Sequence, residues 1–282
     1  MKERDQYLKE FGYVFAPTAE ENVITGEIRR QVGQAMAFDP GTERIISRAI
    51  SQNPQINTNL PRLIVGVGVG LELDFIPKGV SVIGVDNHEG LLTEASKRAE
   101  RLGYKFTPLK TDAMHLDDRI QVGSLGAIHA RLLFQHNPED FVPNALNTYR
   151  EKLAPCGFVY AMDLDASTWR MEPECWGFTN IMQAIDTMYE RGGRDRNIGN
   201  KLAVLLEETG FEIYESDIYE IPDPTKKLHL STLEGMGKGV VYSNIISPDE
   251  FQMNFEEVVK ATPEATVHNP TVYQYIASPT HL

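Results

Sequence analysis

The sequence lacks the features that mark several large classes of protein. It has only two cysteines in 282 residues, Cys156 and Cys175, too few for a disulfide framework or a cysteine-rich metal site. No apolar run approaches the roughly 20 residues that a membrane-spanning helix needs. The first ten residues, MKERDQYLKE, contain no apolar core of a secretory signal. We therefore expect a cytoplasmic protein with reduced thiols.

Basic residues are also scarce. Lys and Arg number 27 against 40 Asp and Glu, which gives a formal net charge of −13. Proteins that bind a phosphate backbone need a basic face, and anionic membranes attract basic segments. The charge therefore argues against nucleic acid and membrane as partners and favours a small-molecule substrate. It leaves monomer and homodimer open.

From residue 62 onward, short β-branched apolar runs alternate with amphipathic segments. The runs predict strands at 62–67, 80–86, 104–113, 124–134, 157–165, 211–221 and 271–278. Helices are predicted at 89–102, 138–153 and 195–209, and another begins at Ser247-Pro248. This alternation predicts an α/β fold with a mostly parallel sheet and helices on both faces. Pro108 places the third strand near an edge, and an antiparallel final strand beside the sixth would fit.

Two regions lie outside this alternation. Residues 1–57 are predicted to be helical, with one helix over 19–38, a break at Phe38-Asp39-Pro40-Gly41-Thr42, and a second helix over 42–51. Residues 166–193 are rich in aromatic residues and are predicted to be irregular.

A glycine-rich loop follows the first predicted strand. Gly66, Gly68 and Gly70 stand at alternate positions, which lets the backbone turn tightly and approach a ligand. The dinucleotide fingerprint G-x-G-x-x-G fails because Leu71 or Leu73 occupies the place of its third glycine. A nicotinamide dehydrogenase is thus disfavoured. The spacing fits a nucleotide-like ligand without a pyrophosphate, or a turn that binds nothing.

Acidic residues end the next two predicted strands. Asp86, 20 residues after Gly66, can accept two hydrogen bonds from a ribose diol, or can cap the following helix. Asp112 can accept a hydrogen bond from the exocyclic amine of a purine, or can be an ordinary loop carboxylate.

Together these elements resemble the class I S-adenosylmethionine-dependent methyltransferases of the small-molecule type. Residues 128–165 resemble the fourth strand, helix and fifth strand of that family, and the turn at 153–157 resembles its L-x-P-G-G motif with Cys156 replacing one glycine. Residues 26–42 resemble the helical lid that precedes the core in many members. The resemblance implies a Rossmann-like fold with a seven-stranded, mostly parallel sheet and a helical lid. It divides the chain into a lid at 1–57 and a cofactor-binding core at 58–282, with a substrate-lid insertion at about 166–193.

The resemblance also implies a cofactor, S-adenosylmethionine, with S-adenosylhomocysteine as its product. The cofactor-binding positions that it implies are Gly66, Gly68 and Gly70 along the methionyl part, Asp86 on the ribose, Asn87 or His88 against the adenine, Asp112 and Ala113 on its amine and ring nitrogen, and Arg131 under the methionine moiety.

Two positions depart from the family pattern. Ile64 stands where an acidic residue is usual, two positions before the first glycine, and Gly126 stands where the fourth strand often begins with Asp. Some proteins of this kind use the fold for cyclisation or isomerisation without methyl transfer, and Ile64 keeps that alternative open. A non-catalytic binding subunit is a further alternative.

Methyl transfer mainly requires proximity and alignment, to which a base can add. The candidate catalytic residues are His136, just after the fourth strand, and Asp165, at the end of the fifth. The candidate substrate-binding residues are aromatic, because a dry aromatic pocket favours a sulfonium, although each could instead pack in the core: Tyr13, Phe15, Trp169, Trp176 and Phe178. No metal spacing stands out near these positions. The sequence predicts O- or N-methylation of a small molecule, such as a secondary metabolite.

Overall fold

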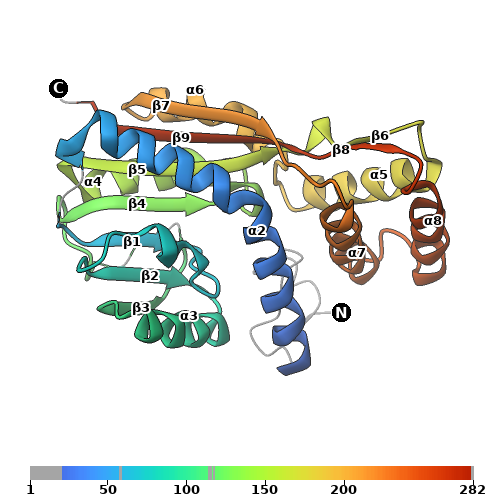
Figure 1. The fold of residues 1–282 in the computed structure, drawn as a ribbon, viewed down its shortest axis with the longest axis horizontal. Coiled ribbons are helices and arrows are strands. Elements are labelled where there is room, and N and C mark those ends of the chain that lie inside the picture. The colour runs from blue at the N-terminus through green and yellow to red at the C-terminus, as the bar shows by residue number, and fades with distance from the viewer. Residues whose placement is uncertain (1–20, 57–58, 114–115, 117, 281–282) are drawn as a thin grey trace.

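A seven-stranded sheet forms the centre of the protein in the computed structural model (Figure 1). The structure describes residues 21–56, 59–113, 116 and 118–280. The strands lie in the order β3-β2-β1-β4-β5-β9-β7. Their bounds are Arg62–Val65 (β1), Val82–Asp86 (β2), Phe106–Lys110 (β3), Leu125–Arg131 (β4), Leu153–Asp165 (β5), Phe211–Glu220 (β7) and Thr271–Pro279 (β9).

The directions of the strands confirm the predicted sheet. Strands β1 to β5 pair in parallel, whereas β9 runs antiparallel to both β5 and β7. Pro108 lies in β3, at the edge of the sheet, where its missing N–H costs no ladder hydrogen bond. The carboxyl ends of the parallel strands therefore meet along one edge, which we call the carboxyl edge.

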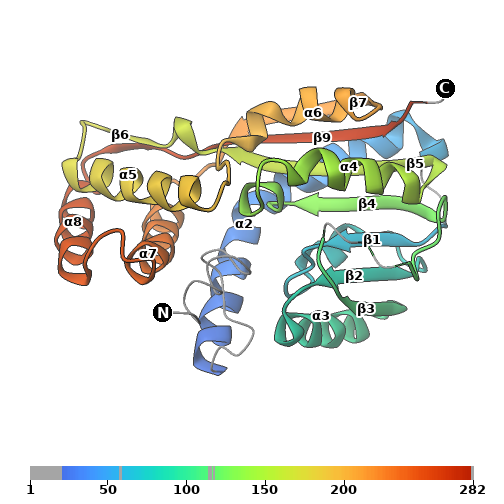
Figure 2. The ribbon, with the colours of Figure 1, turned by 180° about the vertical axis from the view of Figure 1, so that it is seen from behind.

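Helices cover both faces of the sheet (Figures 1 and 2). Alternate strand residues serve the two faces: Leu63 and Val65 pack with α4 (Phe141–Lys152) and α6 (Leu202–Glu208), while Ile64 packs with α3 (Glu89–Leu102). Helix α2 (Glu21–Gln52) packs on the second face against β4, β5 and β9. Five short 3₁₀ helices complete this part of the described chain: Pro54–Ile56 (η1), Leu71–Phe75 (η2), Phe134–His136 (η3), Ala166–Thr168 (η4) and Ile198–Lys201 (η5).

The predicted break in the first helical region is wrong, because α2 continues through Pro40. Proline removes one helical hydrogen bond, but tertiary contacts hold the turn in place. The Thr42 hydroxyl donates to the Phe38 carbonyl at 3.3 Å, and the amide of Gln274 in β9 donates to the Gly41 carbonyl at 3.0 Å. The sheet thus keeps helical a segment that its sequence alone would interrupt.

The segment 166–193 is also more regular than predicted. It contains β6 (Arg170–Glu172) and α5 (Trp176–Arg191). These pack with α7 (Lys227–Tyr242), α8 (Pro248–Ala261) and β8 (Thr266–His268), which lie between β7 and β9 in the chain. Strands β6 and β8 pair antiparallel, and the helices share a hydrophobic core distinct from that of the sheet.

We call residues 166–193 and 222–268 the extension; it lies beyond the carboxyl ends of β5 and β7 (Figure 1). The predicted start of α8 is confirmed, since Ser247 caps it by accepting from the Glu250 N–H. Helix α7 was not predicted. Within the described ranges, no helix is both long and apolar enough to cross a bilayer.

The close contact at Gly41 generates a testable prediction. A Cβ atom at Gly41 would overlap the ring of Tyr219. We expect Gly41→Ala to lower the free energy of unfolding by about 1–3 kcal/mol in urea titrations, the usual cost of overpacking. The matched control is Ser47→Ala in the exposed part of the same helix, which should change stability by less than about 0.5 kcal/mol. Equal effects of the two substitutions would contradict the contact.

Candidate active site

The glycine loop between β1 and η2 has the backbone conformation that its sequence predicts. Gly66, Gly68 and Gly70 have φ values of +67°, +52° and +77°, in the left-handed region that favours glycine. The Gly70 N–H donates to the Val67 carbonyl at 2.8 Å and closes the turn. The loop therefore folds tightly against the carboxyl edge.

Asp86 ties this loop to the end of β2. Its carboxylate accepts the Gly68 N–H and the His88 N–H, each at 2.9 Å. Burial raises the pKa of Asp86, and these backbone hydrogen bonds oppose that rise. A carboxylate has about four acceptor positions, so it retains capacity for a ligand hydroxyl. The alternative that Asp86 caps α3 does not hold, because the ring of His88 accepts the Leu91 N–H instead.

The other residues expected beside the adenine lie on neighbouring strand ends. Asn87 is exposed directly after Asp86, whereas His88 is buried against the start of α3. Asp112 is exposed and Ala113 half-buried, just beyond β3, which pairs with β2. The sheet therefore places these positions side by side at the carboxyl edge.

Helix α2 passes over the glycine loop. The side-chain oxygen of Gln31 accepts the Val69 N–H at 3.2 Å. A Cβ atom at Gly68 would stand 2.6 Å from that oxygen. An acceptor oxygen thus sits directly on the loop, in a space that only glycine leaves open.

A mostly buried cluster of charged side chains connects η2, which follows the glycine loop, with β4 and α2. Arg131, at the end of β4, pairs with Asp39 of α2 at 2.8 Å. Glu72 of η2 lies 3.5 Å from His129 of β4, and only 10% of its side chain is exposed. Within the described chain, Oε2 of Glu72 and Nη1 of Arg131 have no hydrogen-bond partner.

The pKa shifts in this cluster follow from burial and charge. Burial opposes the charge of Arg131, but Tyr160, Glu72 and Asp39 together raise its pKa. Burial raises the pKa of Asp39, and Arg131 works against that rise. The cluster holds two carboxyl groups and one guanidinium, so it has one acidic group in excess.

Glu72 brings an acidic side chain close to the position of Ile64, which is itself apolar. Ile64 is fully buried and is the register partner of His129, the residue that Glu72 approaches. An acidic group is therefore present beside that position, but it comes from η2. Sequence reasoning missed Glu72 and Asp39. The signal for Glu72 was its position two residues after Gly70.

The segment after β4 carries the first catalytic candidate. His136 ends η3, and its ring centroid lies 6.5 Å from that of Tyr189 in α5. Asp163 holds η3 in place, because its carboxylate accepts the N–H groups of Phe134 at 2.8 Å and Gln135 at 3.1 Å. Asp163 is fully buried, and burial raises its pKa to about 7.

The second candidate, Asp165, lies where β5 meets the extension. One carboxylate oxygen accepts the Ser167 N–H at 3.0 Å, and the other accepts from the amide of Asn200 at 2.9 Å. These contacts make Asp165 the cap of η4. They give it a positioning role, and its catalytic role stays a prediction.

Comparison with known proteins identifies the fold. No family model matches the sequence, and no curated protein matches it significantly. Among solved structures, MccD protein is 16% identical and superposes with a TM-score of 0.55 over 86% of this chain and 99% of its own. A Bacillus halodurans protein assigned to the methyltransferases is 15% identical, with a TM-score of 0.54 over 84% and 99%. The cyclase SpnF is 14% identical, with a TM-score of 0.51 over 85% and 82%.

The chain has the class I methyltransferase fold. This confirms the predicted fold class, including the mixed sheet and the layers of helices. At these identities the likeness establishes the fold alone, because one fold serves many activities. The activities named for these neighbours are theirs.

The aromatic candidates fall into three groups in this methyltransferase fold. Trp169 and Phe178 are buried in the extension, with ring centroids 5.7 Å apart in an edge-to-face arrangement. Trp176 begins α5 and is 67% exposed, away from both. Tyr13 and Phe15 lie outside the described residues. The structure therefore brings together two of the five.

The raised pKa of Asp163 generates a prediction for stability against pH. The folded carboxyl titrates at about 7 and the unfolded one near 3.8, so the folded state holds the extra proton between these values. The free energy of unfolding should therefore fall as pH rises from about 4 to about 7, by up to a few kcal/mol at about 1.4 kcal/mol per pKa unit. Asp163→Asn should remove this dependence in urea titrations at pH 5 and pH 8. Parallel pH profiles for both proteins would contradict it.

Proposed function

We propose that the carboxyl edge binds S-adenosylmethionine and that the protein transfers its methyl group to a small molecule, at oxygen or nitrogen. This proposal rests on one observation: the glycine loop lies between a strand-end carboxylate and a cluster of charged side chains. On one side Asp86 pins the glycine loop at the end of β2. On the other side lies a mostly buried cluster with an excess acidic group.

The residues present fit this cofactor. Asp86 retains acceptor capacity for ribose hydroxyls. The Val69 N–H, which now meets the Gln31 oxygen, offers a donor for the cofactor's carboxylate. Among the described residues, Oε2 of Glu72 has no hydrogen bond and lies 3.5 Å from Nδ1 of His129; with Asp39 nearby, it offers an acceptor for the ammonium group of the cofactor. Asn87, Asp112 and Ala113 line the adenine side, as the resemblance implies. An amino acid joined to a nucleoside thus meets complementary groups along its length.

The chain's own residues supply positioning and a base. When bound, the cofactor supplies an electrophilic methyl group on a sulfonium. Asp163 fixes η3 and with it His136, the residue that we propose accepts the proton of the acceptor. A base of this kind is typically worth about 10²–10⁴-fold in rate. Helix α2 lies across the loop at Gln31, beside Val69, which is only 6% exposed. We expect a monomer or homodimer in the cytoplasm.

A cyclisation or isomerisation with bound cofactor is the second candidate function. The fold neighbour SpnF is a cyclase, so this fold is compatible with both reactions. Ile64 in place of the usual acid motivates the alternative. Labelled S-adenosylmethionine separates the two, because turnover of an added small molecule without transfer of label would favour cyclisation or isomerisation.

Substitution of Asp86 tests cofactor binding directly. We expect Asp86→Asn to weaken S-adenosylhomocysteine binding about 10- to 100-fold in isothermal titration, since hydrogen bonds to charged groups are worth about 1.5–3 kcal/mol. Asp249→Asn, on the exposed start of α8, is the control and should leave affinity unchanged. Absence of binding to the unmodified protein would overturn the proposed function.

Glu72 generates a separate prediction about the amino-acid end of the cofactor. Glu72→Gln removes the excess acidic group while keeping its size. We expect it to weaken the binding of S-adenosylhomocysteine at least fivefold. The binding of 5′-methylthioadenosine, which lacks the amino-acid group, should not change. An additional Ile64→Asp substitution should restore part of the lost affinity. Equal weakening of both ligands would show that Glu72 acts only through the fold of the loop.

A further inference from the structure

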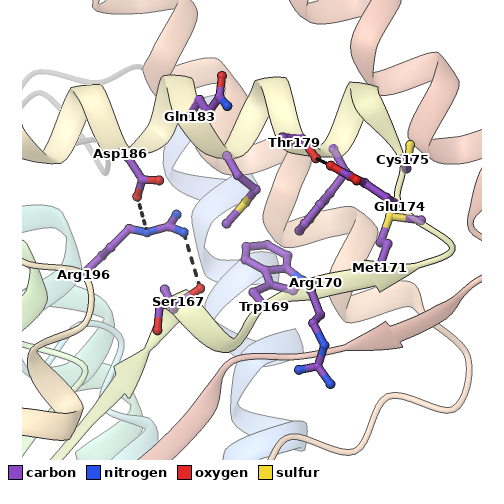
Figure 3. Close-up of a pocket in the computed structure, with 13 residues that line it drawn as sticks. Ser167, Trp169, Arg170, Met171, Glu174, Cys175, Thr179, Gln183, Asp186 and Arg196 are labelled. Carbon is purple, nitrogen blue, oxygen red and sulfur yellow. Dashed lines mark hydrogen bonds and ion pairs between the residues drawn. The ribbon is translucent and has the colours of Figure 1, made fainter.

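A cavity of about 520 Å³ lies in the extension, between α5 on one side and η4 with β6 on the other (Figure 3). All of its lining residues come from 166–196, directly after β5. Its volume falls in the range of small-molecule sites. In open α/β sheets, ligands bind beyond the carboxyl ends of the strands, which is where this segment begins.

One wall of the cavity is apolar and contains two aromatic rings. Trp169, Met171, Phe178 and Met182 line it and are otherwise buried. The indole N–H of Trp169 donates to Nδ1 of His229 at 2.9 Å. Burial lowers the pKa of His229 to about 4, so at neutral pH the ring is uncharged and can accept this bond. The indole is therefore held ready to stack on a planar ligand.

Charged side chains line two parts of the cavity, Arg170 with Glu174 at β6 and Arg196 with Asp186 beside η4. Arg196 is 5% exposed, and its Nε pairs with Asp186 at 2.7 Å. Its Nη2 donates to the Ala166 carbonyl at 3.4 Å, while its buried Nη1 has no hydrogen-bond partner in the described chain. Figure 3 shows Arg196 and Asp186 together at one end, with Trp169 next along the cavity. A buried donor without a partner is costly, so a ligand oxygen there would be stabilising.

The charges at this end select the ligand. Asp186 already balances Arg196, so a carboxylate ligand would meet Asp186 and an amine would meet Arg196. A neutral hydroxyl fits both, because its oxygen can accept from Nη1 while its proton is donated to Asp186. An apolar body attached to the hydroxyl would pack against the apolar wall, and a planar one could stack on the Trp169 indole. A phenol combines the two.

We propose that this cavity binds a planar phenol, with its ring against Trp169 and its hydroxyl between Asp186 and Arg196. The phenol is the methyl acceptor, a role that rests on the function proposed above; for this acceptor the hydroxyl proton passes to Asp186, which takes the place of His136 as the base. The chain's two tryptophans make the binding measurable, because Trp169 lines the cavity and Trp176 is exposed.

The experiment uses Trp176→Phe, which leaves Trp169 as the single fluorescent reporter. Titration with 2-naphthol, without cofactor, should quench Trp169 and should give at least tenfold tighter binding than naphthalene, which lacks the hydroxyl. Arg196→Met in this background should remove that difference. Arg191→Met, at the exposed end of α5, is the matched control and should preserve it.

Asp186→Asn keeps the proposal testable if Arg196→Met does not fold, since Asp186 is half-exposed. This substitution leaves the charge of Arg196 unbalanced. It should weaken the binding of 2-naphthol and strengthen the binding of 2-naphthoate at least fivefold. No quenching by 2-naphthol, equal affinity for 2-naphthol and naphthalene, or unchanged affinity for 2-naphthoate would each overturn the phenol site.

Titration of the same Trp176→Phe protein with S-adenosylhomocysteine separates the two proposals. Binding of S-adenosylhomocysteine without 2-naphthol overturns the phenol site alone. Binding of 2-naphthol without S-adenosylhomocysteine supports the site as a binding site and overturns the proposed function, and with it the acceptor role.

Discussion

The ion pair between the buried Arg131 and the half-buried Asp39 fixes α2 at the carboxyl edge. A buried guanidinium is costly unless it is paired, and here its partner comes from another element. Asp39 lies in α2 next to Pro40, so the pairing fixes the middle of that helix at the end of β4. The amino-terminal half of α2 is then carried over the glycine loop, where Gln31 meets Val69. The pairing therefore places the helix over the loop together with the apolar contacts that Phe38 and Ile45 make with the sheet.

Three aspartates at strand ends bind the backbone of neighbouring segments along the carboxyl edge. Asp86 at the last position of β2, Asp163 near the end of β5 and Asp165 at the last position of β5 each accept backbone N–H groups from a nearby loop or 3₁₀ helix. Loops that leave a parallel sheet have donors without ladder partners, and a carboxylate satisfies two or three of them at once. The loops that carry the candidate site are therefore held by the sheet.

The local patterns predicted most of the sheet, but elements set by distant contacts were missed. Helix α3 has the bounds that its periodicity predicts. The wrong break at Pro40 and the missed α7 have tertiary causes. Helix α7 has several glycines, which lower helix propensity, yet Gly237 lets Phe251 of α8 lie against it. In the candidate site, the glycine loop and Asp86 could be predicted from their spacing in the sequence. Asp39 and Arg196 could not be identified from the sequence, because each acts through an ion pair with a residue on another element.

In this architecture the glycine loop and the extension belong to different parts of the fold. The extension is assembled from two distant stretches of chain, joined by the β6–β8 pair and by a core of their own. Changes in that core need not disturb the glycine loop, which depends on β1, β2 and α2. The two regions still meet, because His136 on η3 lies against Tyr189 on α5. Since Asp163 fixes η3 from within the sheet, the sheet holds His136 in place at the point where it meets Tyr189 of the extension.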